Sequence, residues 1–199
     1  MSKIDFKKAY KELYAPPKKF VTVDVPEMQF LMVDGHGDPN VTQEYQDAVE
    51  ALYAMAYKIK FSSKKQMGRD YVVPPLEGLW WAEDMETFTT ARDKSQWDWT
   101  MMIMTPEWIT AEIFAETIQL VRKGKNPVAL GKVRLETYHE GYSGLMLVRV
   151  RQFLDLQELG LADKTIDVNT KGMCCQLGIQ TCAKAQKCMG MIPFNMELF

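Results

Sequence analysis

The sequence predicts an α+β fold made of a duplicated strand–helix–strand–strand (βαββ) module. Two amphipathic helices are predicted, one over residues 42–60 and one from just after Pro106 to Gly124. Each helix follows a segment of strand character and precedes two more such segments. Strands that are adjacent in the chain favour antiparallel pairing, whereas a doubly wound sheet alternates strands with helices. The 199 residues suffice for one domain, or for two small repeated modules around one core.

The N-terminal part begins with a short helix predicted over residues 3–14. Its aromatic and apolar side chains recur at helical spacing: Phe6, Tyr10, Leu13 and Tyr14. The proline pair at 16–17 ends this helix, because the residue before a proline avoids the helical conformation. Residues 20–25 and 28–34 are predicted as two strands, or as one strand with a bulge at the intervening proline.

The two long helices have recognisable ends, and further strands surround them. Thr42 is the candidate N-cap of the first helix, and Gly124 closes the second. The remaining strands are expected at about residues 70–73, 77–83, 97–104, 131–140 and 143–150. The last two are joined by a turn at Glu140-Gly141, so they are expected to pair with each other.

Composition and charge argue against several classes of partner. Hydrophobic residues make up 47% of the chain, charged residues 25%, and the net charge is −2. Nothing in this balance favours binding to nucleic acid or to an anionic membrane. No apolar run approaches the roughly 20 residues that span a bilayer, and the N-terminus lacks the apolar core of a signal peptide. We expect a cytoplasmic protein, and the sequence leaves its oligomeric state open.

The cysteines and histidines do not form a metal-binding pattern. All four cysteines lie near the C-terminus: Cys174, Cys175, Cys182 and Cys188. Their spacing matches no zinc-binding motif, and His36 and His139 are far away in the sequence. Free thiols are the expectation for a cytosolic protein, so neither a metal nor a cofactor is predicted.

The stretch from Asp70 to Trp108 is the most informative part of the chain, because it holds all five tryptophans. Four of them lie in two segments of strand character, beside three methionines: Trp80, Trp81, Trp97 and Trp99, with Met101, Met102 and Met104. Aromatic walls and flexible thioethers suit a cleft that receives flat or irregular apolar molecules. A tryptophan-rich core hairpin explains the same composition equally well, so both interpretations stay open.

Several motifs in this sequence resemble those of the GyrI-like small-molecule-binding proteins, in their stand-alone, single-domain branch. They are K-E-L-Y-x-P near the N-terminus, M-V-D-G-x-G-x-P-N at 32–40, P-L-E-G-L-W-W at 75–81, W-D-W-T-M-M-I-M at 97–104 and V-R-L-E-T-Y-H-E-G at 133–141. The resemblance covers residues 1–142. It implies two βαββ modules of the SHS2-like type, related by pseudo-twofold symmetry, with a ligand groove between them.

The resemblance implies two classes of function. Many such proteins bind hydrophobic, planar or cationic small molecules for sequestration or sensing, and this is the function expected first. Some stand-alone members are hydrolases that open the cyclopropane rings of DNA-alkylating natural products and so protect the cell; this is the alternative. A transcription regulator would need a DNA-binding segment, and no helix-turn-helix region precedes residue 20.

The candidate site residues lie in or beside these motifs. An apolar surround would raise the pKa of Glu77 and make it a proton carrier, although a structural hydrogen bond would equally explain a glutamate there. Glu136 and Tyr138 share one face of their strand, which is either the groove or the solvent face, and Tyr71 has the same ambiguity. The predicted catalytic residues are Glu77, Tyr71 and Glu136, and the predicted ligand-binding residues are Trp80, Trp81, Trp97, Trp99, Met101 and Tyr138.

The chain departs from the family pattern after Gly141. Family members usually end with a strand carrying a His-x-Glu-Ile-Tyr-Leu-type motif, whose glutamate contributes to the groove, and no position here matches it. A helix is expected over 150–160, but the cysteine-rich end that follows has few charges and no clean periodicity. A reading-frame slip or recombined gene end explains both features, and a divergent tail that has lost the acid is the alternative. We therefore divide the chain into a family-matching part, residues 1–142, and a remainder, residues 143–199.

Overall fold

The structure is a computed structural model that describes residues 3–17, 21–88, 91, 93–149, 174–180 and 190–194. Its α-helices are α1 (Phe6–Ala9), α2 (Lys11–Tyr14), α3 (Gln43–Ser62) and α4 (Ala111–Lys123). Its strands are β1 (Val21–Val25), β2 (Met28–His36), β3 (Leu76–Trp81), β4 (Asp98–Thr105), β5 (Arg134–Tyr138), β6 (Gly141–Arg149), β7 (Cys174–Gln180) and β8 (Gly190–Phe194). The predicted α+β class is confirmed.

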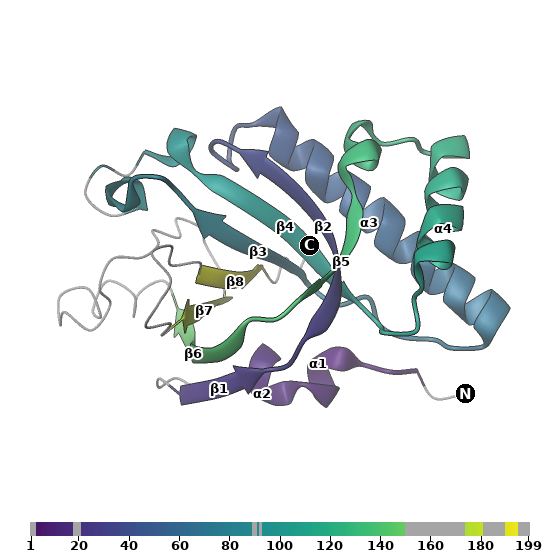
Figure 1. Ribbon diagram of the computed structural model, residues 1–199, viewed down its shortest axis with the longest axis horizontal. Helices are drawn as coiled ribbons and strands as arrows, with labels where there is room; N and C mark the ends of the chain where they lie inside the picture. Colours follow the sequence, from purple (N-terminus) through teal and green to yellow (C-terminus); the bar gives the residue numbers. More distant parts are fainter. Residues whose placement is uncertain are drawn as a thin grey trace.

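The strands form two antiparallel sheets. The larger sheet has the order β5-β2-β4-β3-β8, and the smaller sheet has the order β1-β6-β7. Figure 1 shows α3 and α4 together on one side of the larger sheet, and α1 and α2 close to β1 at the other side. The central strands β2 and β4 are therefore covered on both faces. The duplication of the module and its pseudo-twofold symmetry stay predictions.

The segments on either side of Pro26 are two strands that belong to different sheets. β1 pairs with β6, in a register that sets Val25 opposite Gly141. β2 pairs with β4 on one side and with β5 on the other. Proline has no N–H to donate to a strand partner, which suits the corner where the chain passes from one sheet to the other.

The strand predicted at 70–73 is wrong. Tyr71 forms only an isolated parallel bridge with Ile4, in which the Val72 N–H donates to the Ile4 carbonyl over 2.8 Å. The segment packs against the start of the chain and not along a sheet strand. Sequence periodicity over four residues does not distinguish these two situations.

The three predicted helices that fall on described residues exist, but the boundaries of two of them differ. The helix predicted over 3–14 is broken at Tyr10, whose φ of −105° and ψ of 49° lie outside the helical region. The second long helix begins at Ala111 because Pro106 starts a turn, in which the Ile109 N–H donates to the Pro106 carbonyl over 3.0 Å. Thr110 then caps the helix by accepting a hydrogen bond from the Ile113 N–H.

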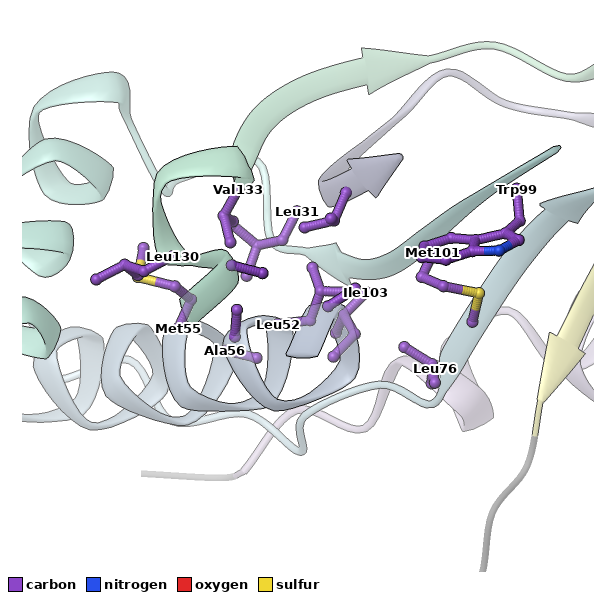
Figure 2. Close-up of a cluster of buried hydrophobic side chains, with 14 of the residues drawn as sticks. Leu31, Leu52, Met55, Ala56, Leu76, Trp99, Met101, Ile103, Leu130 and Val133 are labelled. Carbon is purple, nitrogen blue, oxygen red and sulfur yellow. The ribbon is translucent and has the colours of Figure 1, made fainter. Parts of the chain in front are cut away.

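The main hydrophobic core lies between the larger sheet and α3. It joins alternate residues of the strands to the buried face of the helix, including Leu31, Trp99, Met101, Ile103, Leu52, Met55 and Ala56. Figure 2 shows Met101 and Ile103 of β4 on the side of the sheet that α3 covers. Gly35 of β2 makes room for this packing, because a Cβ there would overlap the ring of Trp99.

Only some of the predictions for the C-terminal region fall on residues that the structure describes. The helix predicted over 150–160 lies outside them. β6 runs through the predicted boundary at residue 142, and β8 adds to the large sheet beside β3. The boundary and the reading-frame slip stay predictions. In the described part of the chain, no helix has the length and apolar character needed to cross a membrane.

Candidate functional site

The larger sheet has two apolar faces with different neighbours. Successive side chains of a strand point to opposite faces, so Leu76 and Trp80 share one face of β3, while Glu77, Leu79 and Trp81 share the other. The first face packs against α3. The second face forms a separate cluster with alternate side chains of β2 and β4 and with the N-terminal helices: Phe30, Met32, Leu79, Met102 and Met104, packed against Phe6, Tyr10, Leu13, Trp81 and Tyr138. We call this second surface the Glu77 face.

Glu77 is a buried carboxyl group in the middle of this apolar face. The residue is 3% exposed, and it lies opposite Met102 in the pairing of β3 with β4. Burial raises the pKa of Glu77 from 4.5 to about 7; the nearby Glu140 adds to the rise, and the hydrogen bond from Tyr14 opposes it. A group with a pKa near 7 takes up and releases protons at neutral pH, as a general acid or base must.

Tyr14 is the hydrogen-bond partner of Glu77. Its hydroxyl donates to Glu77 Oε1 over 2.7 Å, and it comes from α2, sixty-three positions away in the chain. Burial and the neighbouring Glu77 raise the pKa of Tyr14 well above 10. The phenol therefore keeps its proton at neutral pH and acts as a hydrogen-bond donor. The predicted N-terminal helix contained Tyr14, but nothing in the sequence placed it against Glu77.

A second carboxyl group, Glu140, lies near Glu77 and was not among the predicted site residues. It precedes Gly141, whose φ of +72° forms the turn from β5 into β6. Burial raises the pKa of Glu140, while a hydrogen bond with Ser143 opposes the rise. Glu140 in turn contributes to the raised pKa of Tyr138, although burial is the larger cause there. The Glu-Gly turn was visible in the sequence, but its proximity to β3 was not.

The predicted tryptophan and methionine ligands divide between the two faces. Four of them are buried in the core between the sheet and α3: Trp80, Trp97, Trp99 and Met101. Trp97 stacks on Phe88 with ring centroids 4.5 Å apart, and Trp99 donates its indole N–H to the Gly37 carbonyl. These contacts give the four side chains a packing role. Trp81 and Tyr138 instead lie on the Glu77 face, and both are partly exposed.

The two other predicted catalytic residues have different surroundings from Glu77. Tyr71 is fully buried, its ring packs against Phe6 and Trp108, and burial raises its pKa far above the usual value. Glu136 is exposed, and it pairs with the Arg134 Nε over 2.9 Å. Neither has a hydrogen bond to Glu77 among the described interactions. The structure therefore groups Glu77 with Tyr14 and Glu140.

A cavity of about 320 Å³ lies at one end of the Glu77 face, where β2 begins and β4 ends. Its lining combines apolar, aromatic and acidic side chains, including Phe6, Tyr10, Met28, Met104, Trp108 and Glu27. Its volume lies at the lower end of the range found for small-molecule pockets, about 300–1,000 Å³. Within the ranges that the structure describes, no three His, Cys, Asp or Glu side chains gather closely enough to hold a metal ion.

Solved structures share the α+β fold of this protein over almost the whole chain. A crystal structure of an uncharacterized conserved protein from Listeria innocua is 34% identical, has a TM-score of 0.69 and covers 96% of this chain and 98% of its own. Two crystal structures described as hydrolases from Listeria innocua are each 33% identical, with TM-scores of 0.68 and 0.66. They cover 97% and 96% of this chain, and 100% and 98% of their own.

The chain belongs to the same family as these Listeria innocua proteins, because the identity exceeds 30% over nearly full length on both sides. No family model and no curated protein matches it.

Proposed function

We propose that this protein is a small-molecule hydrolase of the GyrI-like family, with Glu77 as its general acid and base. The buried carboxyl group of Glu77 is the observation that supports this proposal most. It accepts a hydrogen bond from the Tyr14 hydroxyl over 2.7 Å, and burial raises its pKa to about 7. A purely structural carboxylate gains from a low pKa, whereas a proton carrier needs a pKa near the working pH. Two Listeria relatives described as hydrolases support the same class of reaction.

The substrate class we propose is a planar, apolar molecule that contains a cyclopropane ring conjugated to a carbonyl group. This follows the GyrI-like resemblance of the motifs at 75–81 and 97–104. The Glu77 face offers suitable surroundings, because Met32, Leu79 and Met102 form an apolar floor, and Trp81 stands at its side.

The proposed reaction adds one water molecule across a strained carbon–carbon bond. The Tyr14 hydroxyl donates to Glu77 Oε1. We therefore assign the other oxygen of the ionised carboxylate, Oε2, to the activation of the water molecule. Glu77 takes a proton from the water while the water oxygen bonds to a ring carbon. The ring bond breaks, and its electron pair moves into the conjugated carbonyl as an enolate. The proton on Glu77 then passes to this oxygen, which leaves the enzyme unchanged.

Binding without catalysis is the second candidate function. It is favoured by one specific observation: the family's His-x-Glu-Ile-Tyr-Leu-type strand, which contributes a groove glutamate, has no match in this sequence. A protein with Glu77 and the apolar face alone would sequester or sense the ligand. We regard cytoplasmic location and a role in self-protection as parts of the same proposal.

The test is turnover of a planar spirocyclopropyl cyclohexadienone, followed by mass spectrometry of a product heavier by one water. We expect Glu77→Gln to lower turnover by roughly 100-fold or more while the ligand still quenches tryptophan fluorescence. Glu116→Gln, an exposed glutamate of α4, is the matched control and should keep full activity. Binding without product in the natural sequence would favour the second candidate. Equal turnover in Glu77→Gln would remove Glu77 from the mechanism.

A further inference from the structure

The solvent-facing side of α3 is a surface separate from the Glu77 face, because α3 covers the other face of the larger sheet (Figure 1). The inner side of the helix, including Leu52 and Ile59, packs in the main core. The outer side carries Tyr53, Tyr57 and Phe61 at helical spacing, and we call these three side chains the aromatic stripe. Tyr57 is 49% exposed and Phe61 is 58% exposed. Contiguous exposed apolar surface marks a contact site, whereas single scattered residues do not.

The aromatic stripe is held in place by contacts within the chain. The rings of Tyr53 and Tyr57 stack, with centroids 6.3 Å apart and an angle of 28° between their planes. The Lys60 ammonium lies 4.7 Å from the Phe61 ring centroid, and the Asp70 carboxylate lies 3.2 Å from that ammonium. Side chains that are already ordered lose little conformational entropy when a partner binds, so they favour association.

Acidic and basic residues are separated along α3 and the helical turn that follows it. The acidic residues lie in the first half of the helix, and the lysines lie in its second half and in the turn: Glu44, Asp47 and Glu50, then Lys58, Lys60, Lys64 and Lys65. The aromatic stripe spans the boundary between the two halves. Antiparallel to a second copy of itself, the helix sets its acidic half against the basic half of the copy. A parallel pair would set like charges together, so the charges favour the antiparallel orientation.

The residues of this surface are also spaced symmetrically about Tyr57. Tyr53 and Phe61 stand four positions before and after it, and Glu50 and Lys64 stand seven positions before and after it. Residues at these spacings share one side of a helix. In an antiparallel pair with its twofold axis at Tyr57, Tyr53 therefore meets Phe61 of the second copy, and Glu50 meets Lys64.

The charges that would meet in this pair are accessible to a second chain. The Glu50 side chain is 43% exposed and the Lys64 side chain is 59% exposed. Each also has an ion-pair partner within its own chain, Lys125 at 2.8 Å from Glu50 and Asp70 at 3.1 Å from Lys64. Exposed ion pairs contribute little free energy. The aromatic stripe therefore supplies most of the affinity, and the charges set the orientation.

We propose that the outer side of α3 is the contact surface of a homodimer, in which two copies of this chain pair their α3 helices antiparallel about a twofold axis at Tyr57. A second copy fits this surface because one helix carries both halves of the complementary charge and a symmetric row of aromatic side chains. One helix from each copy forms a small interface, so we expect a dissociation constant of about 10–100 µM. This proposal is independent of hydrolysis, because it uses none of the residues assigned to the reaction.

The test is analytical ultracentrifugation of the full chain at concentrations from about 5 µM to 1 mM, over which the natural sequence should pass from monomer to dimer. Raising the salt to about 0.5 M should weaken association by roughly 3-fold, because opposite charges meet. Tyr57→Arg should weaken it by at least about 10-fold, because two like charges would face each other at the axis. Tyr142→Arg is the matched control, since Tyr142 lies on β6 and is 62% exposed, and it should leave association unchanged.

Exchange of the two charges tests the register of the pair. Glu50→Lys and Lys64→Glu should each weaken self-association by roughly 3- to 10-fold, because both symmetric contacts become repulsive. A mixture of the two variants should associate within about 2-fold of the natural sequence, since each contact again joins a lysine to a glutamate. Circular dichroism of each variant checks that the fold is retained.

Several results would overturn the proposal. They are a natural sequence that stays monomeric at about 1 mM, and dimers that Tyr57→Arg leaves intact. Association that strengthens with salt would mean that like charges meet, which contradicts the antiparallel orientation. A mixture that associates no better than the single variants would show that Glu50 does not meet Lys64. None of these results depends on whether the protein hydrolyses anything.

Discussion

The two faces of the large sheet are made of similar residues and have different roles. Both are rich in methionine and aromatic side chains, and neighbouring tryptophans of β3 are divided between them. Trp80 lies under α3 in the closed core, whereas Trp81 lies on the opposite face of β3, the face that also carries the buried carboxyl of Glu77. The face that packs on α3, the α3 face, includes the partly buried phenols of Tyr45 and Tyr53, whose pKa values burial raises, whereas the Glu77 face holds a buried carboxyl with a pKa raised to about 7. The comparison shows that polar chemistry, and not aromatic content, distinguishes a candidate site from a core.

The largest expected effect is on the α3 face. Trp99 is fully buried, so Trp99→Ala should lower the free energy of unfolding by about 3–5 kcal/mol. Trp81 is partly exposed, so Trp81→Ala should cost only about 1 kcal/mol but should weaken ligand binding. Urea unfolding of the two variants measures both costs. Equal costs would contradict the division of the two faces.

The next effect is the pH dependence of stability, which comes from Glu77. Its carboxyl titrates near 4.5 when unfolded and near 7 when folded, so the folded protein binds one more proton between these pH values. Stability from this group is complete below pH 4.5 and is lost as the pH rises through 7. The loss is about 3 kcal/mol for a shift of this size.

Denaturant unfolding of the natural protein and of Glu77→Gln between pH 4 and pH 8 measures this loss. We expect the glutamine variant to gain relative stability over that interval, since it has no proton to lose. Parallel pH profiles for the two proteins would mean that Glu77 is not desolvated.

A smaller effect on stability is expected at Gly35, where β2 lies against the ring of Trp99. Gly35→Ala should destabilise the protein by about 1–3 kcal/mol, because the added Cβ overlaps the ring and the core must shift. Gly131 has no atom near the position of an added Cβ, so Gly131→Ala is a matched control. Thermal unfolding of the pair should separate them. A tolerated Gly35→Ala would indicate looser packing under α3.

The smallest effect is expected at Glu136, which the sequence placed among the catalytic candidates. Its pair with Arg134 is exposed, so Glu136→Gln should change stability by less than about 1 kcal/mol. Because Glu136 has no described contact with Glu77, turnover should be unchanged. A large loss of activity with normal stability would return Glu136 to the proposed site.

Local pattern predicted much of the fold, since the long helices, most strands and the tryptophan-rich hairpin follow from periodicity. The sequence predicted both Trp80 and Trp81 as ligand-binding residues, although the alternation of side chains puts them on opposite faces of one strand. It did not indicate which face meets α3, because both faces are covered and both are apolar.

The partners of Glu77 were beyond sequence reasoning for a different reason. Tyr14 reaches Glu77 through the docking of α2, and Glu140 reaches it through the turn into β6. Such contacts between distant segments depend on tertiary packing, which residue spacing does not encode. The raised pKa of Glu77 was foreseen as one of two alternatives, and its cause is burial.

The most direct test of the central claim is the pKa of Glu77 itself, measured by the carboxyl ¹³C chemical shift during a pH titration. We expect a midpoint near 7 in the natural sequence. In Tyr14→Phe the midpoint should be higher, because the hydrogen bond that favours the ionised carboxylate is removed. A midpoint at or below 4.5 in the natural sequence would contradict the account, because Glu77 would then be a permanently ionised structural carboxylate.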